Sequence, residues 1–298
     1  MRALIYLWFG ALSGVLLLGA NTAVANPDTQ AGISNQERAL PAHNSDTLRV
    51  MSLNLAHGRK DSINQFLVTG EQTRENLRDI AKVLQQQDID VLALQEADAP
   101  SRWSGGFDHV SELSRQSSYP ASLHSLHARN WIYNFGTALL SRVAFVDEVQ
   151  HTFAPSPPTT NKGFTLGQVA WQYDSEKTQT LHVDVVSIHL DFSRQSVREQ
   201  QISELISILR QRDHPRIVMG DFNTDWQDED GLIQAVAESL ELHTHAPESL
   251  EMGTYPSSGR RHDWILVSRG LHFLSYETLP DTLSDHLAVI ASLQLKSP

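Results

Sequence analysis

The 298-residue sequence contains no cysteine. Disulfides, thiolate zinc sites and thiol nucleophiles are therefore excluded, and stability must come from a hydrophobic core, which a chain of this length can form. Basic residues are also few, because 23 Lys and Arg stand against 35 Asp and Glu, for a formal net charge of −12. Such a chain gains little from the nonspecific phosphate attraction that drives most nucleic-acid binding, which weakens a nucleic-acid-binding role without excluding it.

Residues 1–25 have the form of a secretory signal peptide. Arg2 supplies a short positive start, residues 3–20 are almost wholly apolar, and residues 23–25 (Ala-Val-Ala) fit the small-x-small rule for cleavage. We expect cleavage after Ala25, export to the periplasm or the medium, and no stable membrane insertion afterwards. A retained N-terminal anchor is the alternative, because the apolar stretch is near the lower limit for spanning a bilayer.

The remaining chain predicts a short lead-in and one domain. Residues 26–47 are polar and are expected to be a disordered lead-in. Residues 48–298 mix strand and helix patterns with no internal repeat or linker, which predicts a single α/β (α+β) domain of two packed β-sheets with helices outside. Helices are expected at 71–87, 109–116, 197–210 and 232–240, and strands at 48–55, 89–95, 137–141, 169–173, 181–190, 216–219, 263–267, 272–276 and 287–295. Ser196 and Glu199 have capping-box form at the start of the third helix.

Polar residues gather at the ends of the expected strands. A single acid in such a position is more often a cap or a surface residue. Six of them in one chain are harder to dismiss, and hard oxygen ligands suit Mg²⁺, Mn²⁺ or Ca²⁺. The six acids and amides are Asn54, Glu96, Asp221, Asn223, Asp263 and Asp285.

Three short motifs offer chemistry beyond metal binding. In Gly220-Asp221-Phe222-Asn223, the carboxylate could hold and deprotonate a water and the amide could donate to a phosphoryl oxyanion, although an Asx-type turn is an equal alternative. In Ser284-Asp285-His286, the imidazole suits proton transfer near neutral pH. The adjacent Asp285 cannot easily hydrogen-bond to that ring, because neighbours on a strand point in opposite directions. A separate acid must orient the ring, and Asp263 is available for this. His189 closes the longest expected strand, where it could assist a leaving oxygen or bond to a backbone group.

Together these motifs resemble the endonuclease/exonuclease/phosphatase superfamily of metal-dependent phosphoesterases. The resemblance covers about residues 48–295, with the motifs in the family's order. It implies a four-layer sandwich of two mixed sheets flanked by helices, with a groove at one rim. The matching segments are Ser52-Leu53-Asn54, Leu94-Gln95-Glu96, Thr137-Ala138-Leu139-Leu140-Ser141, Ile188-His189-Leu190, Gly220-Asp221-Phe222-Asn223, Asp263-Trp264-Ile265-Leu266 and Ser284-Asp285-His286.

The resemblance also implies roles for individual residues. Metal binding falls to Glu96 and Asn54, with Asp285 nearby, and the implied cofactor is Mg²⁺ or Mn²⁺. Five residues would carry out catalysis. Asp221 would activate the attacking water, and Asn223 would stabilise the pentacoordinate phosphate. His286, oriented by Asp263, would contact the scissile phosphate, and His189 would assist His286 or the leaving group.

Four further residues are candidates for substrate binding. His57 and Arg59 place positive charge after Asn54, and Arg198 belongs to an Arg-x-x-Gln pattern that recurs in the family. Thr137 stands where the family commonly has Asn, and its hydroxyl offers one donor where an amide offers two. The contribution of that strand to catalysis is therefore in doubt.

The substrate is less defined than the reaction. We favour an exported phosphodiesterase or phosphatase acting on a small or lipid-linked phosphoester, with an extracytoplasmic nuclease as the alternative and a non-catalytic binding module as a weaker one. The richest basic and aromatic stretch is 127–135, which could stack a base, cover a lipid headgroup or pack beneath a loop, the last being preferred. The sequence leaves the oligomeric state open.

Overall fold

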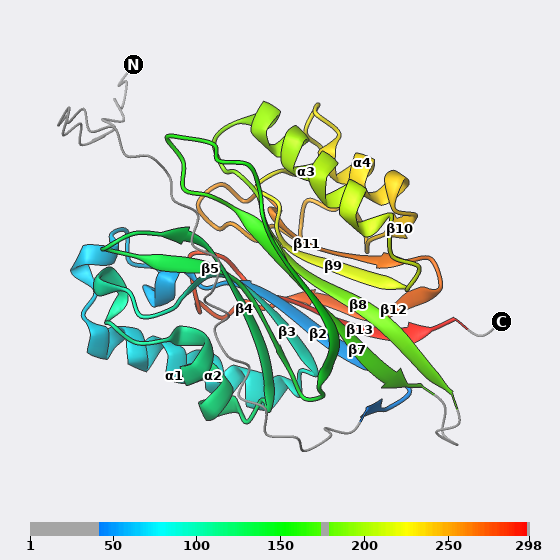
Figure 1. The fold of residues 1–298 in the computed structure, drawn as a ribbon, viewed down its shortest axis with the longest axis horizontal. Helices are drawn as coiled ribbons and strands as arrows, with labels where there is room; N and C mark the ends of the chain where they lie inside the picture. The colour runs from blue at the N-terminus through cyan, green and yellow to red at the C-terminus, as the bar shows by residue number, and fades with distance from the viewer. Residues whose placement is uncertain (1–41, 174–178, 297–298) are drawn as a thin grey trace, which may run out of the picture. The chain divides into compact units, whose positions relative to one another are not determined.

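Two mixed β-sheets form the centre of the fold (Figure 1). The computed structural model describes residues 42–173 and 179–296, so the expected signal segment 1–25 and the lead-in up to residue 41 lie outside the described residues. The strands are β1 (His43–Asn44), β2 (Leu48–Asn54), β3 (Val91–Asp98), β4 (Ala121–Arg129), β5 (Asn134–Ser141), β6 (Phe145–Thr152), β7 (Gly163–Gln172), β8 (Thr180–His189), β9 (Arg216–Asp221), β10 (Leu242–His243), β11 (Asp263–Ser268), β12 (Leu271–Thr278) and β13 (Val289–Leu295).

Each sheet combines parallel and antiparallel pairs. The seven-stranded sheet has the order β1-β7-β8-β9-β11-β10, with β6 also beside β7, and the six-stranded sheet has the order β12-β13-β2-β3-β5-β4. Strands β2 and β3 are parallel, as are β8 and β9, whereas β9 and β11 are antiparallel. The end of β9 therefore meets both the end of β8 and the start of β11 at one rim.

Helices cover the outer face of each sheet, as the two sides of Figure 1 show. Leu77 and Leu84 pack on the six-stranded sheet, and Ile202 and Ile233 pack on the seven-stranded sheet. A third apolar cluster lies between the sheets. These layers confirm the predicted four-layer α/β sandwich. The helices are α1 (Gly70–Gln87), α2 (His109–Ser117), α3 (Gln195–Leu209) and α4 (Leu232–Ser239), with 3₁₀ turns η1 (Ala56–Gly58), η2 (Gln65–Leu67) and η3 (Arg102–Ser104).

The structure departs from the sequence expectations at several elements. Strands β4 and β6 were not expected, because their alternation is broken by His, Asp, Glu and Gln. The predicted capping box of Ser196 and Glu199 is wrong, because α3 follows Arg194 and has no side-chain cap. A capping box does form on α1, between Thr69 and Gln72. Ordered structure also begins before Leu48, since β1 pairs with β7.

Candidate active site

The candidate site lies where the ends of several strands meet. His189 ends β8, Asp221 ends β9 and Asp263 begins β11, and the register places His189 and Asp263 on either side of Asp221. From the other sheet, the Asn54 side-chain amide at the end of β2 donates to Asp221 Oδ2 over 3.0 Å. Both sheets therefore contribute to one constellation, as expected where strands of an α/β fold end together.

A bulge in β3 directs Glu96 into this constellation. Pairing with β5 is interrupted between Leu94 and Ala97, and Glu96 has a φ of +48°. Such bulges re-aim a side chain next to a functional site. Burial opposes ionisation of Glu96, but the nearby His57, Lys162 and His189 outweigh it and lower its pKa to about 2.

Asp221 is held by the turn that follows β9. Gly220 approaches β8 so closely that a Cβ would overlap the backbone oxygen of Ile188, so only glycine fits there. The Asn223 backbone N–H donates to Asp221 Oδ1 over 2.9 Å, and the Asn223 side-chain amide donates to the Leu190 carbonyl over 3.0 Å. Burial, aided by the nearby Asp263 charge, raises the pKa of Asp221 to about 7.

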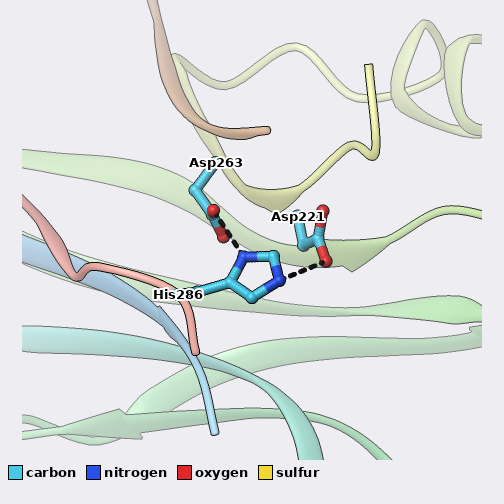
Figure 2. A group of neighbouring side chains, drawn as sticks. All are labelled: Asp221, Asp263 and His286. Atoms are coloured by element: carbon cyan, nitrogen blue, oxygen red, sulfur yellow. Dashed lines mark hydrogen bonds and ion pairs between the residues drawn. The ribbon is translucent and has the colours of Figure 1, made fainter. Parts of the chain in front are cut away.

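His286 lies between two carboxylates (Figure 2). Its Nδ1 is 2.8 Å from Asp263 Oδ2, and its Nε2 is 3.9 Å from Asp221 Oδ2. Burial disfavours the imidazolium, but Asp263 and then Asp221 outweigh it and raise the pKa of His286 to about 10. The Thr254 hydroxyl accepts the backbone N–H of Asp263, which fixes the start of β11. His286 is thus a cation near neutral pH.

The second histidine, His189, has a different environment. Its Nε2 is 3.5 Å from Asp221 Oδ2 and 3.1 Å from the ammonium of Lys162. Burial, followed by the Lys162 charge, lowers the pKa of His189 well below its usual value. One histidine of the site is therefore neutral and the other charged, which suits them to different tasks.

These groups surround a cavity of about 290 Å³. Eight of the site residues expected from sequence line it: Asn54, Arg59, Glu96, His189, Asp221, Asn223, Asp285 and His286. An aromatic wall completes it with Phe192, Tyr255 and His262, and the Tyr255 ring stacks on His262 and lies 4.9 Å from His286.

The other four expected residues lie outside the lining. Asp263 stands behind His286, and His57 stands behind Glu96, with its Nε2 3.3 Å from that carboxylate and its Nδ1 3.0 Å from Asp98. Thr137 is buried between the sheets, where its hydroxyl bonds to Thr165. Arg198 donates to the Asp191 carbonyl and pairs with Asp230.

Four contributors were not foreseen from sequence. Phe192, Tyr255 and His262 enter the cavity from loops, and Lys162 comes from the loop before β7. Lys162 carries the least sequence signal, since it is a single cation in a polar loop. Yet it is buried against His189 and lies 4.0 Å from Glu96.

Two groups in the described residues have donor atoms suited to a divalent cation. Asp221, Asp263 and His286 lie close enough together to share one, but Asp263 and Asp221 already accept the hydrogen bonds described above. Glu96 offers an ionised carboxylate that faces the cavity, with the Asp285 carboxylate also in the lining. Asp285 is bonded to Arg59 over 2.6 Å. Mg²⁺ requires only one or two carboxylates besides water and phosphate, so each of the two groups has enough carboxylates for it.

Comparison with known proteins identifies similar sequences and folds. A family model described as the endonuclease/exonuclease/phosphatase family matches residues 51–286, whereas no curated protein sequence matches. An endonuclease/exonuclease/phosphatase from Beutenbergia cavernae DSM 12333 has a TM-score of 0.65 at 20% identity, covering 84% of this chain and 72% of that one.

Two similar solved structures have more specific names. A mannosyl-6-phosphatase from Bacteroides thetaiotaomicron VPI-5482 has a TM-score of 0.59 at 17% identity, over 83% of this chain and 99% of that one. The human Nocturnin catalytic domain with a bound sulfate anion has a TM-score of 0.58 at 19% identity, over 84% and 94%. At these identities the likeness shows the shared fold alone.

Proposed function

This chain belongs to the endonuclease/exonuclease/phosphatase family, whose members are generally phosphoester hydrolases, and on that premise we propose that it is a divalent-metal-dependent phosphodiesterase or phosphatase. The observation that carries the proposal is the buried Asp221–His286–Asp263 arrangement beside Glu96. A non-catalytic scaffold has no need of a carboxylate with a pKa near 7 next to a histidine with a pKa near 10.

In the proposed reaction Asp221 orients the attacking water and accepts its proton while the water oxygen bonds to phosphorus. A pKa of about 7 suits a general base at neutral pH. The imidazolium of His286 donates to a nonbridging phosphate oxygen, and one side-chain N–H of Asn223 stays free to do the same, because the other donates to Leu190.

The remaining groups act on the leaving side and at the metal. As the P–O bond to the leaving group breaks, an N–H of neutral His189 stabilises the leaving oxygen, which then takes a proton from water. Glu96 and Asn54 would hold Mg²⁺ or Mn²⁺, with Asp285 nearby. Such an ion, when bound, neutralises charge that develops on the phosphate. Arg59 at the same wall attracts an anionic group.

For the substrate we propose a small or lipid-linked phosphoester. The cavity of about 290 Å³ has a cationic Arg59 and an aromatic wall, a combination that suits a compact phosphorylated headgroup. The net charge of −12 opposes a long polyanion such as duplex DNA. The phosphatase among the similar structures is named for a sugar phosphate, and the Nocturnin structure holds a sulfate, an anion that resembles phosphate.

The hydrolase proposal is tested with the expected mature chain, residues 26–298. We expect Mg²⁺- or Mn²⁺-dependent hydrolysis of bis(p-nitrophenyl) phosphate or the monoester, abolished by EDTA. Activity of Asp221→Ala or His286→Ala equal to that of wild type would defeat the proposal. A parallel assay on duplex and single-stranded DNA, sphingomyelin, phosphatidylinositol and inositol phosphates addresses the substrate, and rapid DNA cleavage without lipid activity would favour a nuclease.

We also propose export, on the basis of residues 1–25. Expression in a bacterial host followed by cell fractionation is expected to recover the protein outside the cytoplasm with an N-terminus at Asn26. Recovery in the membrane fraction with Met1 retained would contradict cleavage and support the anchor alternative.

A further inference from the structure

Four large apolar side chains are exposed on segments that hydrogen bonds connect to one another. Ile63 is 94% exposed, Phe66 73%, Leu67 69% and Trp131 73%. Ile63, Phe66 and Leu67 belong to the segment around η2, and Trp131 lies at the tip of the β4–β5 hairpin. Single exposed apolar residues are common, but a group of this kind on one side of a molecule indicates an interaction surface. We name these four residues the apolar rim.

The segments that carry the apolar rim are fixed to one another. The Gln65 side-chain amide donates to the Trp103 carbonyl over 3.2 Å, which joins η2 to η3. The Arg102 backbone N–H donates to the Ile132 carbonyl over 2.8 Å, which joins η3 to the hairpin. The exposed side chains therefore stand on a hydrogen-bonded platform.

An aromatic layer supports this platform from below. The Trp103 ring stacks on Phe135 at 5.8 Å and lies 5.0 Å from Tyr133. In the sequence, stretch 127–135 was expected to pack beneath a loop, and Tyr133 and Phe135 do contact Trp103 in this way. Trp131 of the same stretch remains exposed. Part of the stretch is thus structural and part is left free for contact.

The platform is continuous with the catalytic cavity. Arg59 lines the cavity and donates to the Ser62 carbonyl over 2.9 Å, immediately before Ile63. On the other side, the Trp103 indole donates to Asp98 over 2.9 Å, and Asp98 contacts His57 beside Glu96. Whatever covers the apolar rim would therefore lie at the edge of the cavity.

Charge at the platform differs from charge in the whole chain. Segments 59–68, 100–107 and 129–133 contain four basic residues and one acidic residue, although the whole chain has a net charge of −12. Arg59 and Lys60 pair with Asp285 and Asp79 outside these segments. The basic residues at the surface of the platform are therefore Arg102 and Arg129. The acidic one is Asp61, and the Arg102 guanidinium lies 5.7 Å from the centre of the Trp131 ring. Exposed apolar side chains that include Trp, with basic residues around them, suit the membrane interface, where phosphate headgroups meet acyl chains.

We infer that the apolar rim docks on a phospholipid surface, with Ile63, Phe66, Leu67 and Trp131 entering the boundary layer. Arg102 and Arg129 would meet the lipid phosphates. A fluid lipid layer accommodates side chains from separate convex segments, whereas a folded partner would need a matching set of pockets. Docking would hold the mouth of the cavity against the headgroups. The further step, that a lipid headgroup phosphoester is the substrate, rests on the proposed function.

The test is flotation of residues 26–298 with vesicles of phosphatidylcholine containing a minor share of phosphatidylglycerol. We expect the wild type to float. A Phe66→Ser/Leu67→Ser/Trp131→Ser variant should lose about tenfold or more in partitioning, since three apolar anchors are removed. The matched control is Val146→Ser/Leu274→Ser, which removes exposed apolar residues of β6 and β12 and should float like wild type. Thermal unfolding verifies that each variant is folded.

Several outcomes would overturn the inference. A wild type that stays unbound would do so, as would a rim variant that floats like wild type or a control variant that loses as much as the rim variant. Hydrolysis of bis(p-nitrophenyl) phosphate separates this inference from the proposed function. We expect the rim variant to keep that activity, and Asp221→Ala to float while hydrolysing nothing. A wild type that floats without any hydrolysis would refute the proposed function and leave the docking surface in place.

Discussion

The hydrogen bond between Asp263 and His286 gives the sharpest test of the proposed chemistry. Substitution Asp263→Asn keeps the size of the side chain but removes its charge. In the structure Asp263 Oδ2 lies 2.8 Å from His286 Nδ1, both side chains are buried, and Asp263 contributes most to keeping the imidazole protonated. The substitution should therefore lower the pKa of His286 from about 10 and weaken its hold on the phosphate.

The magnitude follows from the kind of bond that is lost. A hydrogen bond to a charged group contributes about 1.5–3 kcal/mol, and its loss in the transition state corresponds to about 10- to 160-fold in kcat. Folding should also weaken by about 3 kcal/mol, because a buried ion pair loses one partner. Steady-state kinetics measures the first effect, urea unfolding measures the second, and an NMR titration of the metal-free protein follows His286 directly.

A matched variant separates catalysis from stability. Asp184 is another fully buried carboxylate, paired with Arg212 over 2.7 Å in the middle of β8, five residues before His189. Asp184→Asn should destabilise the fold to a similar degree while leaving kcat within about threefold of wild type, since distant buried pairs affect folding rather than transition-state binding. The reasoning would be refuted if Asp263→Asn kept wild-type kcat, or if the titration midpoint of His286 did not fall.

Three further predictions concern other parts of the domain. Gly220→Ala should lower the unfolding free energy by about 3 kcal/mol or more, because the new Cβ would clash with the Ile188 backbone. Gly270→Ala is the control and should cost less than about 1 kcal/mol, because its Cβ would meet open space. Equal costs in urea unfolding would contradict this. The pKa of Glu96 is lowered in the folded state, so the stabilisation from its carboxylate is present above about pH 4.5 and is lost as pH falls toward 2. Over that window metal-free wild type should lose about 3 kcal/mol more unfolding free energy than Glu96→Gln. Parallel plots of unfolding free energy against pH would argue against this. Thr137→Val should lower stability by about 1–3 kcal/mol with kcat unchanged, because its hydroxyl bonds only inside the fold; a large kcat loss would place Thr137 in catalysis.

The sequence predicted the central strands well, and eight of the twelve candidate site residues line one cavity. Hydrophobic runs mark the buried strands, and a polar residue directly after such a run must emerge at a rim. That reasoning placed Asp221 and His189 together, and the register of β8 and β9 shows them as neighbours. It also separated His286 from Asp285: the first lies against Asp263 and the second against Arg59.

What the sequence could not supply depends on contacts between distant segments. Lys162 enters the site because β7 lies beside β8, a pairing that no local pattern encodes. Thr137 was a candidate because its motif matches the family, yet its hydroxyl lies between the two sheets. Edge strands β4 and β6 have too much polar character for a periodicity argument. Tertiary context decides such cases.

The pairing of β13 with β2 has a consequence for how the protein folds during its synthesis. Strand β2 supplies Asn54 early in the chain, but its neighbour β13 comes after His286, near residue 290. During synthesis the six-stranded sheet cannot close, and His286 cannot reach Asp263, until the segment that carries His286 and β13 has left the ribosome. Nascent chains stalled before Asp285 should therefore be inactive, and catalytic competence should appear in one late step.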